Sequence, residues 1–372
     1  MTARDRFLAT LRFESPDRVP YHELGLWGQT VERWIGEGMP PNAVPQSMFY
    51  GNEFFGLDKR DFANVAVSMI PAFEPQVLEE TERYVVARDA RGIVSKAMKI
   101  GTVRGTRPSM NQYLGFPVRN RADFEALKKR YDPSTPTRYP KTWAEDVKRW
   151  ADRDYPLCLL TNGTFGFYSA PRQWMGTENL SVAFYDDPTL MHDILEFLAD
   201  FFMRTVERAM AEVKFDYFNF FEDLAYKTGP LISPKIFREF MLPRYKRVIE
   251  FLRGHGCDLI TVDSDGNLEA LIPMLLEAGV TGIWPCEIAA GMDPVKLRKE
   301  YGQALALSGG IDKRLLARDK RTVEREVMGK LPWLIEQGGF IPTVDHTVPP
   351  DVSYQNFLYY LELKRKAAEG RG

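Results

Sequence analysis

Short apolar runs recur along the chain from residue 156 onward, and each is followed by a polar or glycine-rich break and then by a helical stretch. Near-continuous apolar runs of this length are typical of strands that are buried on both faces, as in parallel sheets. The pattern predicts six such strands, at residues 156–163, 217–224, 258–266, 282–287, 305–312 and 339–346.

The segments between these runs have the features of helices. Ser233 offers an N-cap and Pro234 a first helical residue, and apolar residues then recur near a period of 3.6 up to Gly254. Residues 267–277 and 320–336 follow the same pattern. Six strand–helix units in succession indicate an α/β fold, and right-handed crossovers make a closed barrel a natural outcome.

Two more strands would complete the eight of a (β/α)8 barrel. Residues 18–24 supply the first candidate, directly after a helix expected over residues 3–12. Residues 62–70 supply the second. We therefore expect a single domain over residues 1–372, folded as a (β/α)8 TIM barrel.

A long insertion separates the second predicted strand from the third, which does not begin until residue 156. Within the insertion, residues 77–99 alternate between apolar and polar in the manner of strands, and Arg91 and Gly92 mark a hairpin turn. We expect an inserted β-hairpin and loops in the N-terminal half, packed beside the barrel.

Composition narrows the classes of function. The 372 residues include 49 Lys and Arg against 51 Asp and Glu, so neither sign of charge favours nucleic acid or an anionic membrane as the main partner. Three cysteines and four histidines exclude, within one chain, a four-cysteine zinc site, a four-thiolate iron–sulfur cluster and a disulfide framework. Charges in the first eight residues do not suit a signal peptide, and the apolar runs are too short to span a bilayer, so we expect a cytoplasmic protein.

The active site of such a barrel forms at the C-terminal ends of the strands. Many polar residues fall at those predicted ends. Helix N-caps after strands also favour aspartate, so a structural role is the alternative for any one of them. The residues are Glu23, Asn162, Glu222, Asp223, Asp263, Ser264, Asp265, Cys286, Glu287, Asp312, Asp345 and His346.

Asp263 and Asp265 are two residues apart, so on a strand both carboxylates point to the same side. Two carboxylates that lie next to each other repel unless they share either a proton or a cation. His346 offers a nitrogen, and either Cys286 or Glu287 a fourth group, since only one of that pair should face inward. Such a set fits Zn²⁺ or another divalent metal, although a backbone partner for His346 is an equal alternative.

A second acidic pair, Glu222 and Asp223, is suited to acid–base work or to binding a substrate, with capping of a loop as the structural alternative. Four aromatic residues near strand ends are candidates for an apolar substrate pocket, although aromatic residues there more often belong to the core. They are Trp27, Phe165, Tyr168 and Trp284.

Five ordered segments resemble the uroporphyrinogen decarboxylase-like family, and together they extend over nearly the whole chain. They are residues 4–20, 223–234, 264–267, 308–312 and 345–352. The resemblance implies a (β/α)8 barrel. The family includes porphyrinogen decarboxylases and zinc-dependent methyltransferases that work with corrinoid proteins or thiol acceptors.

The decarboxylases of this family use an arginine-rich segment just after the first strand. The corresponding residues 24–30 contain no arginine, and the next is Arg33. A polyanionic tetrapyrrole would lack its obvious counter-charges here. His346 nevertheless matches the position of a decarboxylase histidine after the last strand, so this branch stays open.

The thiol-activating methyltransferases of the family use a His-x-Cys pair after the fifth strand and a cysteine after the eighth. This chain has Asp263, Asp265 and His346 at those positions. A carboxylate-rich zinc site better suits polarising an ether or alcohol oxygen, so that a methyl group can leave to cob(I)alamin. That resembles the O-demethylating members, and an aromatic pocket suits an aryl methyl ether.

These observations lead first to a methyltransferase that passes a methyl group from a small substrate to a corrinoid protein. The predicted metal ligands are Asp263, Asp265, Glu287 and His346, and the predicted catalytic residues are Glu222, Asp223 and His346. The alternative is a metal-independent decarboxylase of a porphyrinogen or a smaller carboxylic acid, in which Asp265, Glu222 and His346 handle protons. A barrel that only binds a ligand or partner is the third hypothesis.

Overall fold

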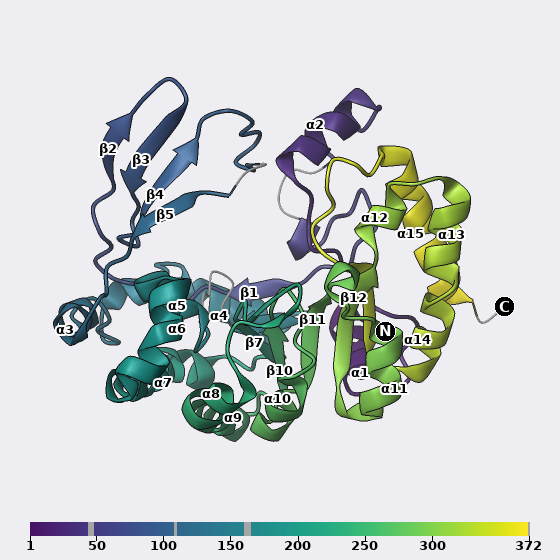
Figure 1. Ribbon diagram of the computed structural model, residues 1–372. Coiled ribbons are helices and arrows are strands. Elements are labelled where there is room, and N and C mark those ends of the chain that lie inside the picture. The colour runs from purple at the N-terminus through teal and green to yellow at the C-terminus, as the bar shows by residue number, and fades with distance from the viewer. Residues whose placement is uncertain (44–47, 108–109, 160–164, 371–372) are drawn as a thin grey trace.

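The computed structural model describes residues 1–43, 48–107, 110–159 and 165–370. Its centre is a curled, wholly parallel sheet of seven strands, which follow one another across the sheet in chain order (Figure 1). The strands are β1 (Asp61–Ala63), β6 (Leu157–Leu159), β7 (Tyr217–Phe221), β10 (Leu259–Asp263), β11 (Gly282–Cys286), β12 (Ala306–Ile311) and β13 (Phe340–Val344). All six apolar runs are confirmed as strands, and the α/β class with them.

Helices cover the outer face of the curled sheet (Figure 1). The predicted helix over 267–277 is shorter than expected, and the one over 320–336 is divided in two before Pro332. These helices are α7 (Pro188–Glu212), α8 (Pro234–Ile236), the π-helix η3 (Phe237–Met241), α9 (Leu242–Gly254), α10 (Ile272–Ala278), α11 (Pro294–Tyr301), α12 (Lys313–Leu316), α13 (Lys320–Met328), α14 (Leu331–Gln337) and α15 (Tyr354–Glu369). No helix in the described part of the chain is both long and apolar enough to cross a membrane.

The predicted N-terminal helix is confirmed as α1 (Ala3–Leu11), which begins with a capping box between Thr2 and Asp5. Its buried side chains Phe7 and Leu11 pack with the first inward-facing residues of the strands, including Tyr217 and Ile341. This helix therefore closes the N-terminal end of the curled sheet.

The first predicted strand, over residues 18–24, is not formed as a strand in the structure. The Tyr21 amide instead donates to the side chain of Asp58 (2.8 Å), and the segment contacts β13 through the Glu23 side chain, which accepts from the Val344 amide (3.0 Å). Pro20 also has no amide hydrogen to give to a ladder. One isolated parallel bridge, between Leu26 and Val348, joins the next residues to the C-terminal part of the chain. The second predicted strand is reduced to β1.

The insertion is larger than the predicted hairpin. It forms an antiparallel sheet of four strands, β2 (Gln76–Glu80), β3 (Tyr84–Arg88), β4 (Val94–Met98) and β5 (Gln112–Gly115), which stands away from the parallel sheet (Figure 1). The predicted turn is confirmed, and Gly92 adopts a φ of +83° there. The remaining elements are α2 (Gly28–Gly36), α3 (Arg121–Lys128), α4 (Trp143–Ala151), α5 (Ser169–Met175), α6 (Thr177–Asp186), β8 (Ala225–Tyr226), β9 (Gly229–Pro230) and the 3₁₀ turns η1 (Met48–Tyr50), η2 (Pro136–Arg138), η4 (Ile288–Ala290) and η5 (Gly302–Ala304).

One buried ion pair ties the two ends of the chain to the sheet. The Glu23 carboxylate accepts hydrogen bonds from Lys364 (2.8 Å) and Tyr360 (2.6 Å) of α15, in addition to that from Val344. The side chains of both charged residues are only 1% exposed. Burial lowers the pKa of Lys364, and the adjacent carboxylate opposes that effect. The pair holds α15, β13 and the segment before α2 together.

Replacing one member of this pair should destabilise the fold strongly. We expect Lys364→Met to lower the free energy of unfolding in urea by about 3–5 kcal/mol, because it leaves the Glu23 carboxylate buried without its cation. The Glu23→Gln/Lys364→Met double variant should recover part of that loss. Lys296→Met, which breaks an exposed pair with Glu269, is the control and should change little. Equal effects of Lys364→Met and Lys296→Met would contradict this account.

Candidate functional site

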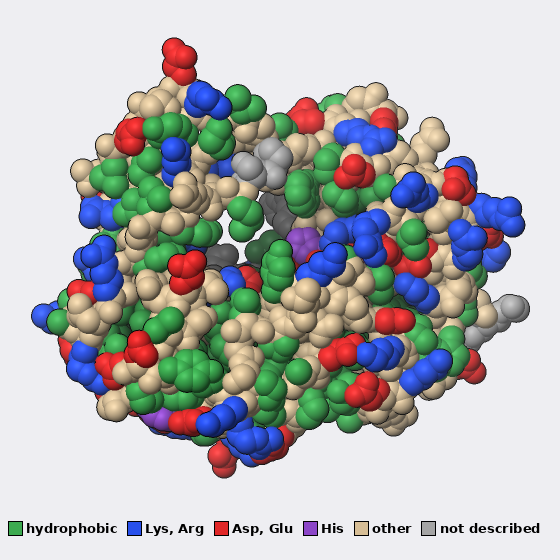
Figure 2. Space-filling view, viewed as in Figure 1, with side chains coloured by type: hydrophobic (Ala, Val, Ile, Leu, Met, Phe, Trp, Pro, Cys, Tyr) green, Lys and Arg blue, Asp and Glu red, His purple; other side chains and the backbone are tan. Residues whose placement is uncertain are grey.

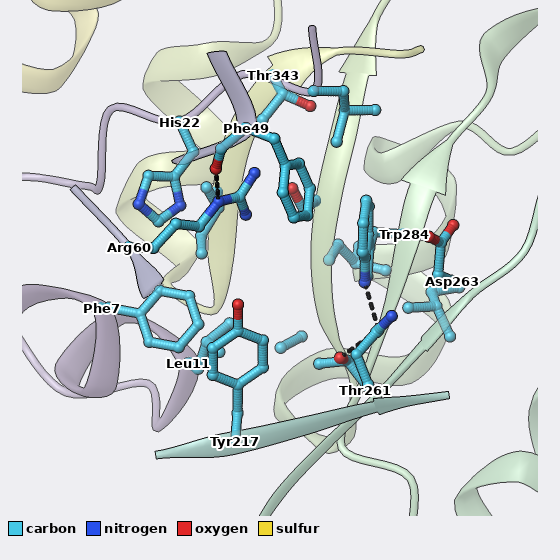
Figure 3. A pocket seen from close by; sticks show the side chains of 18 of the residues that line it. Phe7, Leu11, His22, Phe49, Arg60, Tyr217, Thr261, Asp263, Trp284 and Thr343 are labelled. Atoms are coloured by element: carbon cyan, nitrogen blue, oxygen red, sulfur yellow. Dashed lines mark hydrogen bonds between the residues drawn. The ribbon is translucent and has the colours of Figure 1, made fainter. Parts of the chain in front are cut away.

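A cavity of about 100 Å³ lies on the concave side of the parallel sheet (Figure 3). Alternate residues of each strand face it, as the pleat of a strand requires, so β7 contributes Asn219 between Tyr217 and Phe221, and β10 contributes Asp263. Six aromatic side chains form a large part of the wall: Phe7, Phe49, Phe62, Tyr217, Phe221 and Trp284. The cavity is therefore a mainly apolar chamber with a few polar groups.

A hydrogen-bonded group fixes one wall of the cavity. The side-chain oxygen of Asn219 accepts from the indole of Trp284 and from the hydroxyl of Thr261, each at 2.7 Å. Because these residues lie on three neighbouring strands, the ring of Trp284 is held in one orientation. Phe49 stacks between Trp284 and Phe62, with ring centroids 5.7 Å and 5.0 Å away.

Two basic residues that the sequence analysis did not select, Arg60 and His22, lie at the floor of the cavity (Figure 3). Arg60 precedes β1 by one residue and faces inward with Phe62, so its place beside an apolar run was the available signal. His22 sits in the segment predicted as the first strand. Both residues are buried.

Asp263 ends β10 and is the carboxyl group that faces the cavity. Within the described ranges, its side chain has no hydrogen bond or ion pair. Burial raises its pKa well above the ordinary range, the nearby carboxylates of Asp265 and Asp223 raise it further, and the charge of Arg60 opposes these effects. Burial thus favours the protonated form of Asp263, the form that can donate a proton.

Three carboxylates at the mouth of the cavity are each paired with a basic group. Asp265 lies 3.3 Å from Nε2 of His346, whose Nδ1 is 2.8 Å from the hydroxyl of Thr347. Glu287 pairs with Lys313 (3.2 Å). Asp223 pairs with Arg172 (2.6 Å) and has a φ of +52°, a strained conformation for a residue other than glycine. Above this mouth, Figure 2 shows a hollow between the antiparallel sheet and α2.

The predicted metal ligands do not come together as a metal site. No group of three or more His, Cys, Asp or Glu side chains with a suitable arrangement exists among the residues that the structure describes. Two of the four, Asp265 and His346, lie together at 3.3 Å, whereas Glu287 pairs with Lys313 and Asp263 faces the cavity. Cys286 is buried in the main core, with a pKa raised to about 12 by burial, so Glu287 is the member of that pair at the mouth.

Glu222, predicted as catalytic, has a structural position instead. Its carboxylate is fully buried and accepts from the amides of Phe167 (2.7 Å), Tyr168 (2.8 Å) and Ser169 (3.1 Å) at the start of α5, and from the hydroxyl of Tyr245. Burial raises the pKa of Glu222 to about 7, although these hydrogen bonds lower it. With its oxygens committed in this way, Glu222 does not reach a ligand in the cavity.

The predicted substrate-binding aromatics divide between the site and the core. Trp284 lines the cavity. Trp27 lies at the mouth, where its indole donates to Thr347 (2.9 Å). Phe165 and Tyr168 belong to the main core, with Phe165 stacked on Phe202 at 4.0 Å. Asn162, another residue noted at a strand end, is outside the described residues.

The pairing of His346 with Asp265 can be tested directly. The hydrogen bond to Asp265 raises the pKa of His346 above its ordinary value of 6.5. The stabilisation from this raised pKa is complete below pH 6.5 and is lost as the pH rises through the higher folded-state pKa. NMR titration of the ring proton should give a pKa above 6.5, and Asp265→Asn should lower it. Asp193→Asn, far from the site, should leave it unchanged; no shift with Asp265→Asn would refute the pairing.

Comparisons with known proteins fit this architecture. A uroporphyrinogen decarboxylase of Pelodictyon phaeoclathratiforme is 22% identical over 382 residues, covering 99% of both chains. One of Thermus thermophilus is 26% identical over 270 residues, covering 68% of this chain and 71% of the other. Among solved structures, a methyltransferase from Methanosarcina mazei is similar in fold, with a TM-score of 0.63, 15% identity and coverage of 98% and 99%.

The family model described as "Uroporphyrinogen decarboxylase (URO-D)" matches residues 93–367, which include every strand of the parallel sheet except β1. The resemblance noted from five sequence segments is thereby confirmed. The match also includes the cavity wall formed by β7, β10 and β11 and the ion pairs at its mouth. The chain belongs to the uroporphyrinogen decarboxylase (URO-D) family.

Proposed function

We propose that this protein is a decarboxylase that acts on a small aromatic carboxylic acid inside the cavity, by proton transfer without a metal. The observation that carries the proposal is the position of Asp263, a buried carboxyl group that faces a mainly apolar cavity and forms no ion pair with the described residues. A carboxylic acid kept neutral by burial is a suitable general acid.

The size of the cavity favours a small substrate over a porphyrinogen. Its volume is about 100 Å³. Pockets for drug-sized ligands have roughly 300 Å³ or more, and a cavity of about 150 Å³ accepts benzene. A tetrapyrrole does not fit such a space, and a single-ring acid is admitted only when the walls move to widen the cavity.

In the proposed reaction, Asp263 donates its proton to the ring carbon that carries the carboxylate, and the π electrons of the substrate form the new C–H bond. The bond from that carbon to the carboxylate then breaks, its electron pair returns to the ring, and CO₂ leaves. Asp263 regains a proton from solvent through the mouth, where the pair of His346 and Asp265 lies nearby. The net reaction thus converts the anion of the aromatic acid and one proton into the decarboxylated ring and CO₂.

Corrinoid-linked methyl transfer, with O-demethylation of an aryl ether, Zn²⁺ and a corrinoid protein as partner, stays a prediction from the family resemblance. The aromatic cavity is compatible with it. The carboxylates at the mouth are paired with basic side chains, and in this arrangement they do not fit a zinc site. We therefore derive no step through a metal. Chelation distinguishes the two reactions, as described below.

We also propose that the parallel sheet closes into the eight-stranded barrel expected from the sequence. The segment before α2 would occupy the place of the eighth strand. The bridge from Leu26 to Val348 and the bond from the Val344 amide to Glu23 support this placement.

The decarboxylase proposal predicts release of ¹³CO₂ from a panel of carboxyl-labelled aromatic and heteroaromatic mono- and dicarboxylic acids, measured by mass spectrometry. Asp263→Asn should lower the rate by about 10²- to 10⁴-fold, because the proton donor is lost. Asp258→Asn, at the opposite end of the same strand segment, is the matched control and should keep the rate. Chelation of metals should have no effect. Methyl transfer to cob(I)alamin that is lost on chelation and restored by Zn²⁺, with no CO₂ released, would contradict the proposal.

A further inference from the structure

The floor of the cavity carries a positive charge that no acidic side chain neutralises. Arg60 lines the cavity and forms no ion pair with any described residue. Its Nε donates to the carbonyl oxygen of Phe49 and one terminal nitrogen to that of Glu23 (3.3 Å), while the Tyr217 hydroxyl is its other hydrogen-bond partner. The Glu23 carboxylate itself is already paired with Lys364.

Other buried arginines show how this fold normally satisfies a guanidinium. All three nitrogens of Arg138 donate to carbonyl oxygens, at 2.7 to 3.4 Å. Arg153 pairs with the buried carboxylate of Asp216 (2.8 Å). Arg60 also donates to two carbonyl oxygens, but it differs from both of these arginines because its guanidinium lines a cavity that a ligand could enter. A buried charge that is left without a counter-charge is costly, so a fold retains it where a ligand supplies the opposite charge.

His22 provides an independent second observation. Its side chain lies beside Arg60 at the cavity floor (Figure 3), and the residue is only 3% exposed. Neither ring nitrogen has a hydrogen-bond partner among the described residues. Burial and the nearby cations, Arg60 first, lower its pKa well below the ordinary value, so the ring is neutral and has one N–H to donate. Buried polar groups without a partner are rare in folded proteins.

The walls around these two groups favour an organic anion. The ring of Phe49 covers the guanidinium of Arg60, with its centroid 3.6 Å from Cζ. Phe7 closes the floor beside His22, with ring centroids 5.8 Å apart. A planar guanidinium matches the geometry of a carboxylate, and an apolar surround strengthens that attraction.

We infer that Arg60 and His22 form a binding site for the carboxylate of a small aromatic acid at the floor of the cavity. This inference deepens the proposed function. If that function also holds, the carboxylate at Arg60 is one that the substrate keeps, because a guanidinium stabilises a carboxylate against loss. The substrate would then be a small dicarboxylic acid, whose reacting carboxylate lies toward Asp263.

Binding of benzoate, measured by calorimetry and by thermal shift, tests the site without any turnover. Benzoate should bind and raise the melting temperature, and neutral benzamide should not. Arg60→Met should weaken benzoate binding by roughly tenfold or more, since a charge-assisted hydrogen bond is lost. Without ligand, Arg60→Met loses two hydrogen bonds to carbonyl oxygens but also removes a buried charge that has no counter-charge, so its melting temperature should fall less than that of Arg138→Met, which loses four such bonds.

Arg138→Met is the matched control, since Arg138 is equally buried but serves only carbonyl oxygens: it should lower the melting temperature and leave benzoate affinity unchanged. If Arg60→Met fails to fold, His22→Phe replaces it and should also weaken benzoate binding. Unchanged benzoate affinity in the folded variant, or equal protection by chloride or benzamide, would overturn the inference. Benzoate binding through Arg60 with no CO₂ release from any acid would refute the proposed function alone. CO₂ release that Arg60→Met leaves intact would refute this inference alone.

Discussion

The cost of burying charge in an apolar interior governs this structure. Lys364 and Arg60 are both buried inside the fold, but only Lys364 forms an ion pair with a described carboxylate. Lys364 meets the carboxylate of Glu23, and that pair joins the C-terminal helix to β13 and to the N-terminal segment. Arg60 meets only uncharged groups among the described residues and faces a cavity. The first arrangement holds the fold together, and the second leaves a positive charge available to a ligand.

Because the parallel sheet surrounds the cavity, the cavity has two chemically different ends. The cation lies at the floor, where α1 closes the sheet, and Asp263 lies at the carboxyl end of β10. Aromatic rings fill the space between them, with Trp284 fixed by Asn219. Solvent reaches this chamber from the mouth, where three carboxylates are paired with basic groups. A small planar acid suits a chamber with a cation at one end and a proton donor at the other.

Much of the fold followed from the sequence, because apolar runs and helix caps are local signals. The six strands from residue 157 onward were predicted, but the segment at 18–24 formed no strand, since the Asp58 side chain binds the Tyr21 amide there and Pro20 has no amide hydrogen to donate. The site was less accessible to prediction. The alternation that placed Asp263 inward is local, whereas the burial of Glu222 against α5 and the pairing of Glu287 with Lys313 depend on contacts distant in sequence. Arg60 was missed because its one signal, a place beside a short apolar run, does not show that the side chain faces inward.

The most direct test of the account is a crystal structure of the protein with 4-bromobenzoate, in which anomalous scattering locates the bromine. The account predicts the carboxylate within hydrogen-bonding distance of Arg60 and His22, with the bromine directed toward Asp263. A ligand held instead in the hollow above the mouth, between Arg172 and Lys313, with Arg60 still facing an empty cavity, would contradict it.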